Sequence, residues 1–197
     1  LMLGISYGGV RIPLMVTVLL IVGVIKGTVS LATLVFCLIA LIFLTLPAAI
    51  VLSIVSKWII IGRYKPGEYP LWSFYYFRWW LATRVQGLSG VGRFAGTPIM
   101  SLYYRLMGAK VGKNCIIDTG LCAIYDLVTI GDDTSIGAQT HLLGYRVEDG
   151  MLKIGRTTIG SRCFVGTHSG FGLNTKMGDD SYLGDLSLLP DGAEMKA

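Results

Sequence analysis

A six-residue repeat in the C-terminal half constrains the fold of this chain more than any other feature. Apolar residues six positions apart run from Ile159 to Leu189, and glycine follows most of them directly. This period fits neither an α-helix, whose apolar positions recur every three or four residues, nor a strand that alternates every second residue. It predicts a parallel β-helix with three short faces per coil, in which one apolar side chain per face points into a narrow prism.

The repeat also predicts the size of the prism and one interruption in it. From Val111 to Leu189 we expect about four coils, stacked at the usual strand spacing of about 4.8 Å. The glycines after the apolar residues, often followed by Asp or Asn, are expected to allow tight corners. Residues 143–153 break the period and predict a loop thrown out of the prism, where function is often found. The step from Ile154 to Ile159 is five, so the register is disturbed after this loop.

The N-terminal part has a different character. Between Ile12 and Ser56 the only charged residue is Lys26, and this length exceeds one membrane span of about 20 residues. We predict a transmembrane helical hairpin with one span over 5–25 and a second over 31–56, in which Pro47 is a candidate kink. A signal peptide is a poor alternative because its apolar core is too short, and a buried pair of soluble helices would need a much larger chain around it.

Charge is distributed unevenly along the rest of the chain. Residues 57–113 carry nine basic residues and one acidic residue, whereas residues 114–197 have a net charge of −5. A basic segment directly after a span predicts contact with the anionic inner leaflet rather than with nucleic acid. We therefore expect a multi-pass protein of the inner (cytoplasmic) membrane with its β-helix on the cytoplasmic side.

The basic segment is also dense in aromatic residues, above all between Tyr69 and Leu81. Trp and Tyr favour the headgroup level of a membrane, so we expect a helix over 72–88 that lies in the interface. A core-facing aromatic helix is the alternative. Other local signals predict a turn at Pro66–Gly67, a loop over 87–97 and a short helix near 98–107. Three parts result: a hairpin over 1–56, an interfacial segment over 57–107 and a β-helix over 108–197.

Two resemblances add to this interpretation. The six-residue pattern resembles the left-handed β-helix of hexapeptide-repeat acyltransferases, and the left hand is implied by that resemblance because the period does not fix it. Residues 57–72, 76–81, 144–150 and 183–192 are similar to the C-terminal membrane domain of ε-poly-lysine-synthetase-type nonribosomal peptide synthetases. In that family, helix pairs alternate with related soluble modules downstream of adenylation and carrier domains. The expected fold is an α transmembrane hairpin plus an all-β left-handed parallel β-helix, truncated at its C-terminus and cut from a larger polypeptide.

The resemblance implies a catalytic residue. A histidine near an ejected loop acts as general base in hexapeptide acyltransferases, and His141 directly precedes the loop over 143–153. Imidazole suits this role because its pKa lies near neutrality. The donor would be a thioester, from carrier-protein phosphopantetheine or coenzyme A, with no tightly bound cofactor. The alternative is that His141 is a solvated corner residue.

Further polar residues are candidates for substrate binding: Tyr145, Glu148, Asp149, His168, Asn174 and Asp185. Each is also compatible with a solvated loop or corner position. Two histidines without HxxxH spacing do not favour a metal site, and the four cysteines, which form no CxxC pair, are expected to be small core residues.

Three functions follow as hypotheses. The first is a membrane-anchored acyl- or aminoacyl-transferase module that forms amide bonds between amino-acid units. The second is a non-catalytic scaffold that anchors or oligomerises a synthetase at the membrane, and the third is a transport element built from several copies. Expected partners are the lipid bilayer, carrier and adenylation domains, and sibling β-helix modules or a homotrimer.

Overall fold

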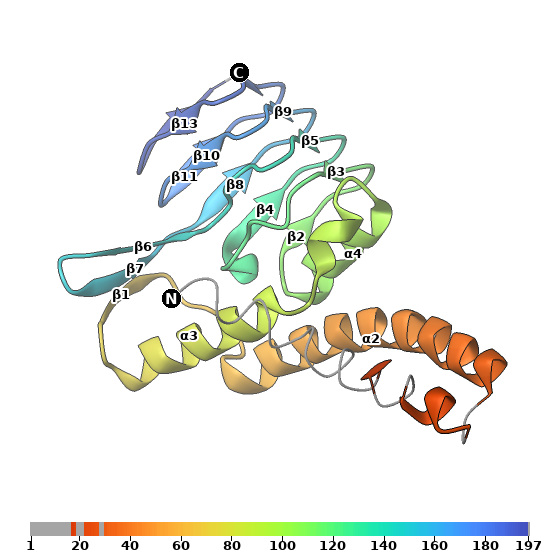
Figure 1. The fold of residues 1–197 in the computed structure, drawn as a ribbon. Coiled ribbons are helices and arrows are strands. Elements are labelled where there is room, and N and C mark those ends of the chain that lie inside the picture. Colours follow the sequence, from red (N-terminus) through yellow and green to blue (C-terminus); the bar gives the residue numbers. More distant parts are fainter. Residues whose placement is uncertain (1–16, 19–21, 28–29, 197) are drawn as a thin grey trace.

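A computed structural model describes residues 17–18, 22–27 and 30–196. Figure 1 shows a tapering stack of β-coils standing above a base of helices. Most of the predicted first span, over 5–25, lies outside the described residues. The turn predicted near Lys26 is described: the Gly27 N–H donates to the Val24 carbonyl at 2.9 Å, and Gly27 has φ +70°.

The long helix α2 covers Leu31–Ile60 and corresponds to the second predicted span, extended by four residues. Ser30 caps its N-terminus by accepting a hydrogen bond from the Thr33 N–H at 3.1 Å, and Pro47 lies inside it. Among the described residues, α2 is the one helix long and apolar enough to cross a membrane. A second spanning helix, and therefore a hairpin, is not shown.

Shorter helices connect α2 to the β-coils. Helix α3 covers Phe74–Gly87, close to the predicted 72–88, and Ser73 caps it. The predicted loop over 87–97 contains a 3₁₀-helix, η1 (Val91–Phe94). Helix α4 covers Pro98–Leu106, close to the predicted 98–107, with proline in its first turn, where the missing N–H costs nothing. A second 3₁₀-helix, η2 (Tyr125–Leu127), ends the first coil.

The C-terminal half is a parallel β-helix of about five turns, which confirms the predicted parallel β-helix but exceeds the four coils that the repeat predicted. Its first face is the five-stranded sheet β14-β11-β8-β4-β2, and its second is the four-stranded sheet β12-β9-β5-β3. The third face pairs β10 with β13 and continues through the bridges Cys122–Leu142 and His141–Gly170. The strands are β2 (Lys110–Val111), β3 (Ile116–Ile117), β4 (Val128–Ile130), β5 (Ser135–Ile136), β8 (Thr157–Ile159), β9 (Phe164–Val165), β10 (Gly170–Phe171), β11 (Thr175–Met177), β12 (Tyr182–Leu183), β13 (Leu188–Leu189) and β14 (Glu194–Met195).

The apolar residues of the six-residue repeat fill the prism as predicted. All of them are at most 7% exposed and form one core cluster, namely Ile130, Ile136, Leu142, Ile159, Val165, Phe171, Met177, Leu183 and Leu189. Burying one such side chain stabilises a fold by about 1.5–3 kcal/mol, so this column is the main source of stability in the coils.

The glycines of the repeat act differently from expectation. Gly131, Gly160 and Gly166 do not have positive φ; a Cβ at any of them would approach backbone atoms of the next coil within 2.4–2.6 Å. Glycine is therefore required by close stacking of coils. The left-handed corner position lies two residues later and is held by side-chain-bearing residues such as Asp133 and His168.

The segment expected to be an ejected loop is a β-hairpin. Strands β6 (Tyr145–Glu148) and β7 (Met151–Ile154) pair antiparallel, and β7 also pairs with β1 (Gly67–Pro70), so a three-stranded sheet projects from the prism. The turn predicted at Pro66–Gly67 is thus the start of a strand. Ile154 belongs to this hairpin rather than to the six-residue repeat, which explains the step of five before Ile159.

A second core cluster lies beneath the hairpin and joins it to the helices. Leu152 and Ile154 pack there with Trp79 of α3 and Ile61 at the end of α2. The Lys57 ammonium of α2 is fully buried and lies 2.8 Å from the Asp126 carboxylate of η2. These contacts fix the helices and the β-helix as one body.

Candidate functional site

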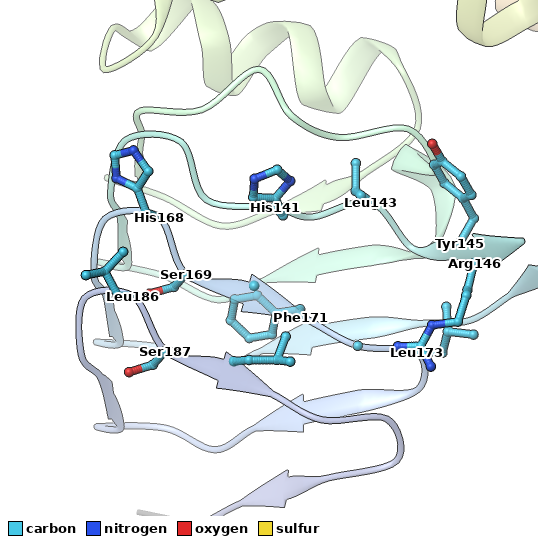
Figure 2. Close-up of a pocket in the computed structure, with 13 residues that line it drawn as sticks. His141, Leu143, Tyr145, Arg146, His168, Ser169, Phe171, Leu173, Leu186 and Ser187 are labelled. Carbon is cyan, nitrogen blue, oxygen red and sulfur yellow. The ribbon is translucent and has the colours of Figure 1, made fainter.

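The candidate site is a pocket of about 380 Å³ on the third face of the β-helix, where the β6–β7 hairpin leaves the prism. Figure 2 shows His141 in the middle of this face, His168 at one corner, and Tyr145 and Arg146 at the opposite end. The floor is apolar and comes from Phe171 of β10 and its neighbours on β13. Strands of the coil stack therefore hold most of the pocket, and the hairpin supplies one wall.

His141 is positioned by its backbone. Its N–H donates to the Ser169 carbonyl at 2.8 Å, and its carbonyl accepts from the Phe171 N–H at 3.2 Å. The next residue, Leu142, is fully buried, so the alternation of a strand directs the His141 side chain outward. The sequence alone thus predicts the exposure of His141, since it directly precedes an inward position of the repeat.

His168 lies at the other end of the pocket, at a corner with φ +55°. Its N–H donates to the Ala138 carbonyl of the preceding coil at 2.9 Å. In the described part of the chain, no side chain hydrogen-bonds the imidazole of either histidine. Both rings line the pocket and are free to meet a ligand there.

The hairpin contributes an aromatic and a cationic residue to the pocket wall. The Tyr145 ring packs edge-on against Trp79 with 4.8 Å between centroids. The Arg146 guanidinium binds the Asp191 carboxylate of the fourth coil at 2.5 and 3.1 Å. This pair ties the hairpin to the fourth coil and closes one end of the pocket.

The other predicted site residues lie outside the pocket. Glu148 forms an ion pair with Lys153 at 2.7 Å, and the Asp149 side chain at the hairpin turn is 85% exposed. Asn174 and Asp185 belong to a ladder of corner side chains that accept backbone N–H groups from the preceding coil, those of Arg156 and Thr167. The structure brings together His141, His168 and Tyr145 in one pocket, and the roles of all seven residues stay predictions.

Sequence reasoning missed several pocket residues. Phe171 and Leu188 line the pocket because the third face places them beneath His141, and Arg146 reaches it from the hairpin. A coil adds 18 residues, as between Gly170 and Leu188, but the step from His141 to Gly170 is 29. The hairpin accounts for the extra residues in this step. The neighbours of His141 therefore cannot be counted along the repeat unless the limits of the hairpin are known.

The cysteines of the β-helix are not activated nucleophiles. Burial raises the pKa of the Cys115, Cys122 and Cys163 thiols. A raised pKa lowers the fraction of reactive thiolate at neutral pH. This supports their prediction as small core residues.

No protein-family model matches the chain. In sequence, the chain is 34% identical over 140 residues to the delta-poly-L-ornithine synthetase of Acinetobacter baumannii (strain AB307-0294). This alignment covers 71% of the chain but 10% of the synthetase, so the chain spans about a tenth of that relative's length. Among solved structures, serine acetyltransferase isoform 3 of Entamoeba histolytica, determined with cysteine, superposes with a TM-score of 0.31 and 11% identity, covering 79% of this chain and 59% of that one. The expected resemblance to a synthetase of amino-acid polymers is thus confirmed in sequence for one part of a poly-ornithine synthetase, while the closer assignment to ε-poly-lysine synthetases stays a prediction.

Proposed function

We propose that this chain is a membrane-anchored acyl- or aminoacyl-transferase-like module of a peptide-polymer synthetase. The observation that carries the proposal is the exposed His141 imidazole, without a hydrogen-bond partner among the described residues, in a pocket built on a rigid β-helix. The similarity to a poly-ornithine synthetase supports the substrate class, an amino acid with a side-chain amine. The apolar helix α2 supports attachment to a membrane, and the basic residues that follow it favour a β-helix on the cytoplasmic side of the inner membrane.

In the proposed reaction, an amine of one amino-acid unit attacks the carbonyl of a thioester held by carrier-protein phosphopantetheine or coenzyme A. The C–N bond forms and the C–S bond breaks. His141 takes the proton from the attacking amine and returns it to the departing sulfur, so no net proton is consumed at the imidazole. Tyr145 and His168 would orient the acceptor, because both line the same pocket.

The oxyanion of the tetrahedral intermediate needs hydrogen-bond donors, and backbone N–H groups at the coil corners are one possible source. The corner N–H groups of Thr167 and Leu173 already donate to the Asp185 and Asp191 carboxylates at 2.6 and 2.7 Å. The Arg146 guanidinium lines the pocket and is the cation that we propose to stabilise the oxyanion. A partner that draws Asp191 away would release Arg146 toward the pocket.

Sibling β-helix modules or a homotrimer are proposed to complete the site. The second face of the prism carries an exposed stack of Phe164 on Tyr182, with ring centroids 5.1 Å apart, and the exposed Ile116 lies on the same face with Ser135 between it and Phe164. Such an apolar stripe favours burial against another module. A non-catalytic scaffold is the second candidate function, and the absence of an orienting carboxylate beside either described imidazole favours it.

Replacing His141 by Ala in the full-length synthetase that carries this module separates the two functions. Loss of a general base lowers amide formation by about 10²–10⁴-fold. The fold should persist because the side chain is exposed. Polymer formation is measured by mass spectrometry, with Lys176→Ala as the matched control, since among the described residues Lys176 forms a single surface ion pair, with Glu194. Polymer formed at the parental rate by His141→Ala would reject the general base and leave the scaffold.

A further inference from the structure

The core uses only part of the aromatic segment between Tyr69 and Leu81. Helix α3 buries Trp79 and Ala82 in the second core cluster, beneath the hairpin. Its other side is apolar as well, because Phe74 and Phe77 are 76% and 54% exposed. Trp72, which directly precedes the capping residue of α3, is 94% exposed. Helix α3 is therefore apolar on two sides, and the described residues cover one of them.

The uncovered side of α3 carries a groove of about 430 Å³, which we call the aromatic groove. Its lining consists of Trp72, Ser73, Tyr76, Phe77 and Trp80. Phe77 and Trp80 stack with 6.2 Å between ring centroids, so neighbouring turns of α3 form one wall. The Ser73 hydroxyl accepts the Tyr76 N–H at 3.2 Å and is occupied by this helix cap. A groove of this volume that is lined by four aromatic rings favours an apolar occupant.

A cation without a carboxylate partner lies beside the aromatic groove. The exposed Arg84 guanidinium is 5.5 Å from the Trp80 ring centroid, and it forms no ion pair with any described residue. The surrounding segment, residues 57–113, has nine basic residues and Glu68 as its one acidic residue. An unpaired guanidinium binds phosphate well. The groove therefore favours an occupant that joins an apolar part to an anionic group.

The surface around the groove indicates a membrane rather than a soluble ligand. A small ligand in the groove would leave the Phe74 ring exposed, because Phe74 does not line the groove. Helix α3 lies beside α2 at the base of the molecule (Figure 1), where the Arg78 guanidinium donates to the Ile60 carbonyl at 2.5 Å. Ile59 of α2 is 76% exposed, so both helices expose apolar surface near their junction. A lipid layer covers these groups together, since aromatic rings favour its headgroup level and arginine is attracted to its anionic phosphates.

We propose that the aromatic groove binds an anionic phospholipid of the leaflet next to the β-helix, with acyl carbons against the rings and the phosphate on Arg84. This proposal rests on the membrane attachment proposed above. It depends neither on the chemistry at His141 nor on the depth to which α2 enters the bilayer. It gives the aromatic segment a function, because α3 then holds the module against the headgroup layer in addition to α2.

Retention of anionic lipid tests the cationic part of the site. The full chain is extracted into mild detergent with equal amounts of phosphatidylcholine and phosphatidylglycerol, and the bound phospholipids are counted by native mass spectrometry. Lipid bound along α2 is common to all variants. Arg84→Gln is expected to lower the preference for phosphatidylglycerol about fivefold, the effect of one basic residue at an anionic membrane surface, and Arg84→Lys should retain most of it. Arg156→Gln, which removes an exposed cation of the β-helix, is the matched control.

Trp72→Ala tests the apolar part of the site. Because Trp72 is 94% exposed, the substitution leaves the core clusters intact. It is expected to lower the retention of both phospholipids, whereas Arg84→Gln lowers that of phosphatidylglycerol alone. Val147→Ala, which truncates another exposed apolar residue on the hairpin, is the matched control. Equal retention of phosphatidylglycerol by the parent chain, Trp72→Ala and Arg84→Gln would overturn the lipid site.

A spin label at position 74 separates failure of the lipid site from failure of the attachment. Phe74→Cys and Leu186→Cys are made in the full chain with Cys37 and Cys115 replaced by Ser, since the other two cysteines are buried. In vesicles of the same two lipids, a lipid-soluble relaxation agent is expected to reach the label at 74. It should not reach the label at 186, where the native side chain is 82% exposed on the β-helix.

Three results of the labelling contradict the proposal in different ways. Water contact at position 74 on chains that float with the vesicles would overturn the lipid site and leave the attachment through α2. A label at 74 that neither lipid nor water reaches would show that protein covers this face instead of lipid. Chains that do not float with the vesicles would overturn the attachment and the lipid site together.

Discussion

At the scale of single residues, the Lys57–Asp126 pair decides how the helices hold the β-helix. Both side chains are buried, at 0% and 8% exposure, and Asp126 also accepts the Tyr64 N–H at 3.0 Å. A buried ion pair adds little to the net free energy of unfolding. Removing one partner, however, leaves an unpaired charge in an interior of low dielectric constant, which is strongly destabilising. The sequence showed Lys57 only as part of a basic segment and gave no sign that it is buried.

Asp126→Asn is expected to lower the free energy of unfolding by about 3–5 kcal/mol, because Lys57 then keeps a buried charge without a counter-charge. The double variant Lys57→Met/Asp126→Asn should lose less than the sum of the single variants, since neither charge remains and the amide oxygen introduced at position 126 can still accept the Tyr64 N–H. Urea unfolding in a mild detergent measures both. Additive losses would mean that the two side chains act separately.

At the same scale, the site could be predicted only in part. The resemblance to hexapeptide acyltransferases implies His141 as the general base, and its place before the inward Leu142 predicts that its side chain points outward. Asn174 and Asp185 are predicted to bind substrate, but in the structure both side chains accept backbone N–H groups of the preceding coil. Position in a repeat predicts which side chains point inward, but it does not say which polar side chains are already bonded to the backbone of a neighbouring coil.

At the scale of elements, the period of six predicted the parallel β-helix and its buried column because both depend on local alternation. The β6–β7 hairpin has a local sequence signal in its Asp149-Gly150 turn, where both residues have positive φ, whereas its pairing with β1 has none because β1 lies far upstream in the sequence. Long-range antiparallel pairing leaves no periodic signal in so short a strand. The same limit explains why Pro66–Gly67 was assigned to a turn.

The stacking role of the repeat glycines can be tested by comparing two glycines that hold the same position in successive coils. Gly166 and Gly184 are equivalent and 18 residues apart, but a Cβ at Gly166 would lie 2.4 Å from the Asp185 nitrogen, whereas one at Gly184 meets nothing closer than 3.6 Å. Gly166→Ala is therefore expected to cost about 1–3 kcal/mol through overpacking. Gly184→Ala should be neutral within about 0.5 kcal/mol or slightly stabilising. Thermal or urea unfolding of the two variants compares them directly, and equal losses would contradict stacking as the reason for glycine.

At the scale of the whole molecule, the sequence separated an apolar, uncharged N-terminal part from a repetitive C-terminal part, and the structure agrees with that division. Their contact was not predictable. The one-sided burial of α2, with Ser53 and Lys57 inward, depends on α4 and η2, which lie about 50 and 70 residues further along the chain. A hydropathy pattern marks a segment as able to enter a membrane but not how a folded module restrains it.

The coil stack is quasi-one-dimensional, so stability should vary along it. Strands β4, β8 and β11 are hydrogen-bonded on both sides, as are β5 and β9, whereas β12, β13 and β14 pair on one side only. In this chain, amide hydrogen exchange is therefore expected to be slowest in β4, β5 and β8 and to quicken toward β13 and β14. Exchange followed by mass spectrometry on the lipid-bound chain measures the gradient. Adding Gly166→Ala should speed exchange in the fourth coil more than in the second, because the strain lies between the third and fourth coils. Uniform protection from β4 to β13 would instead mean that the coils unfold as one cooperative unit.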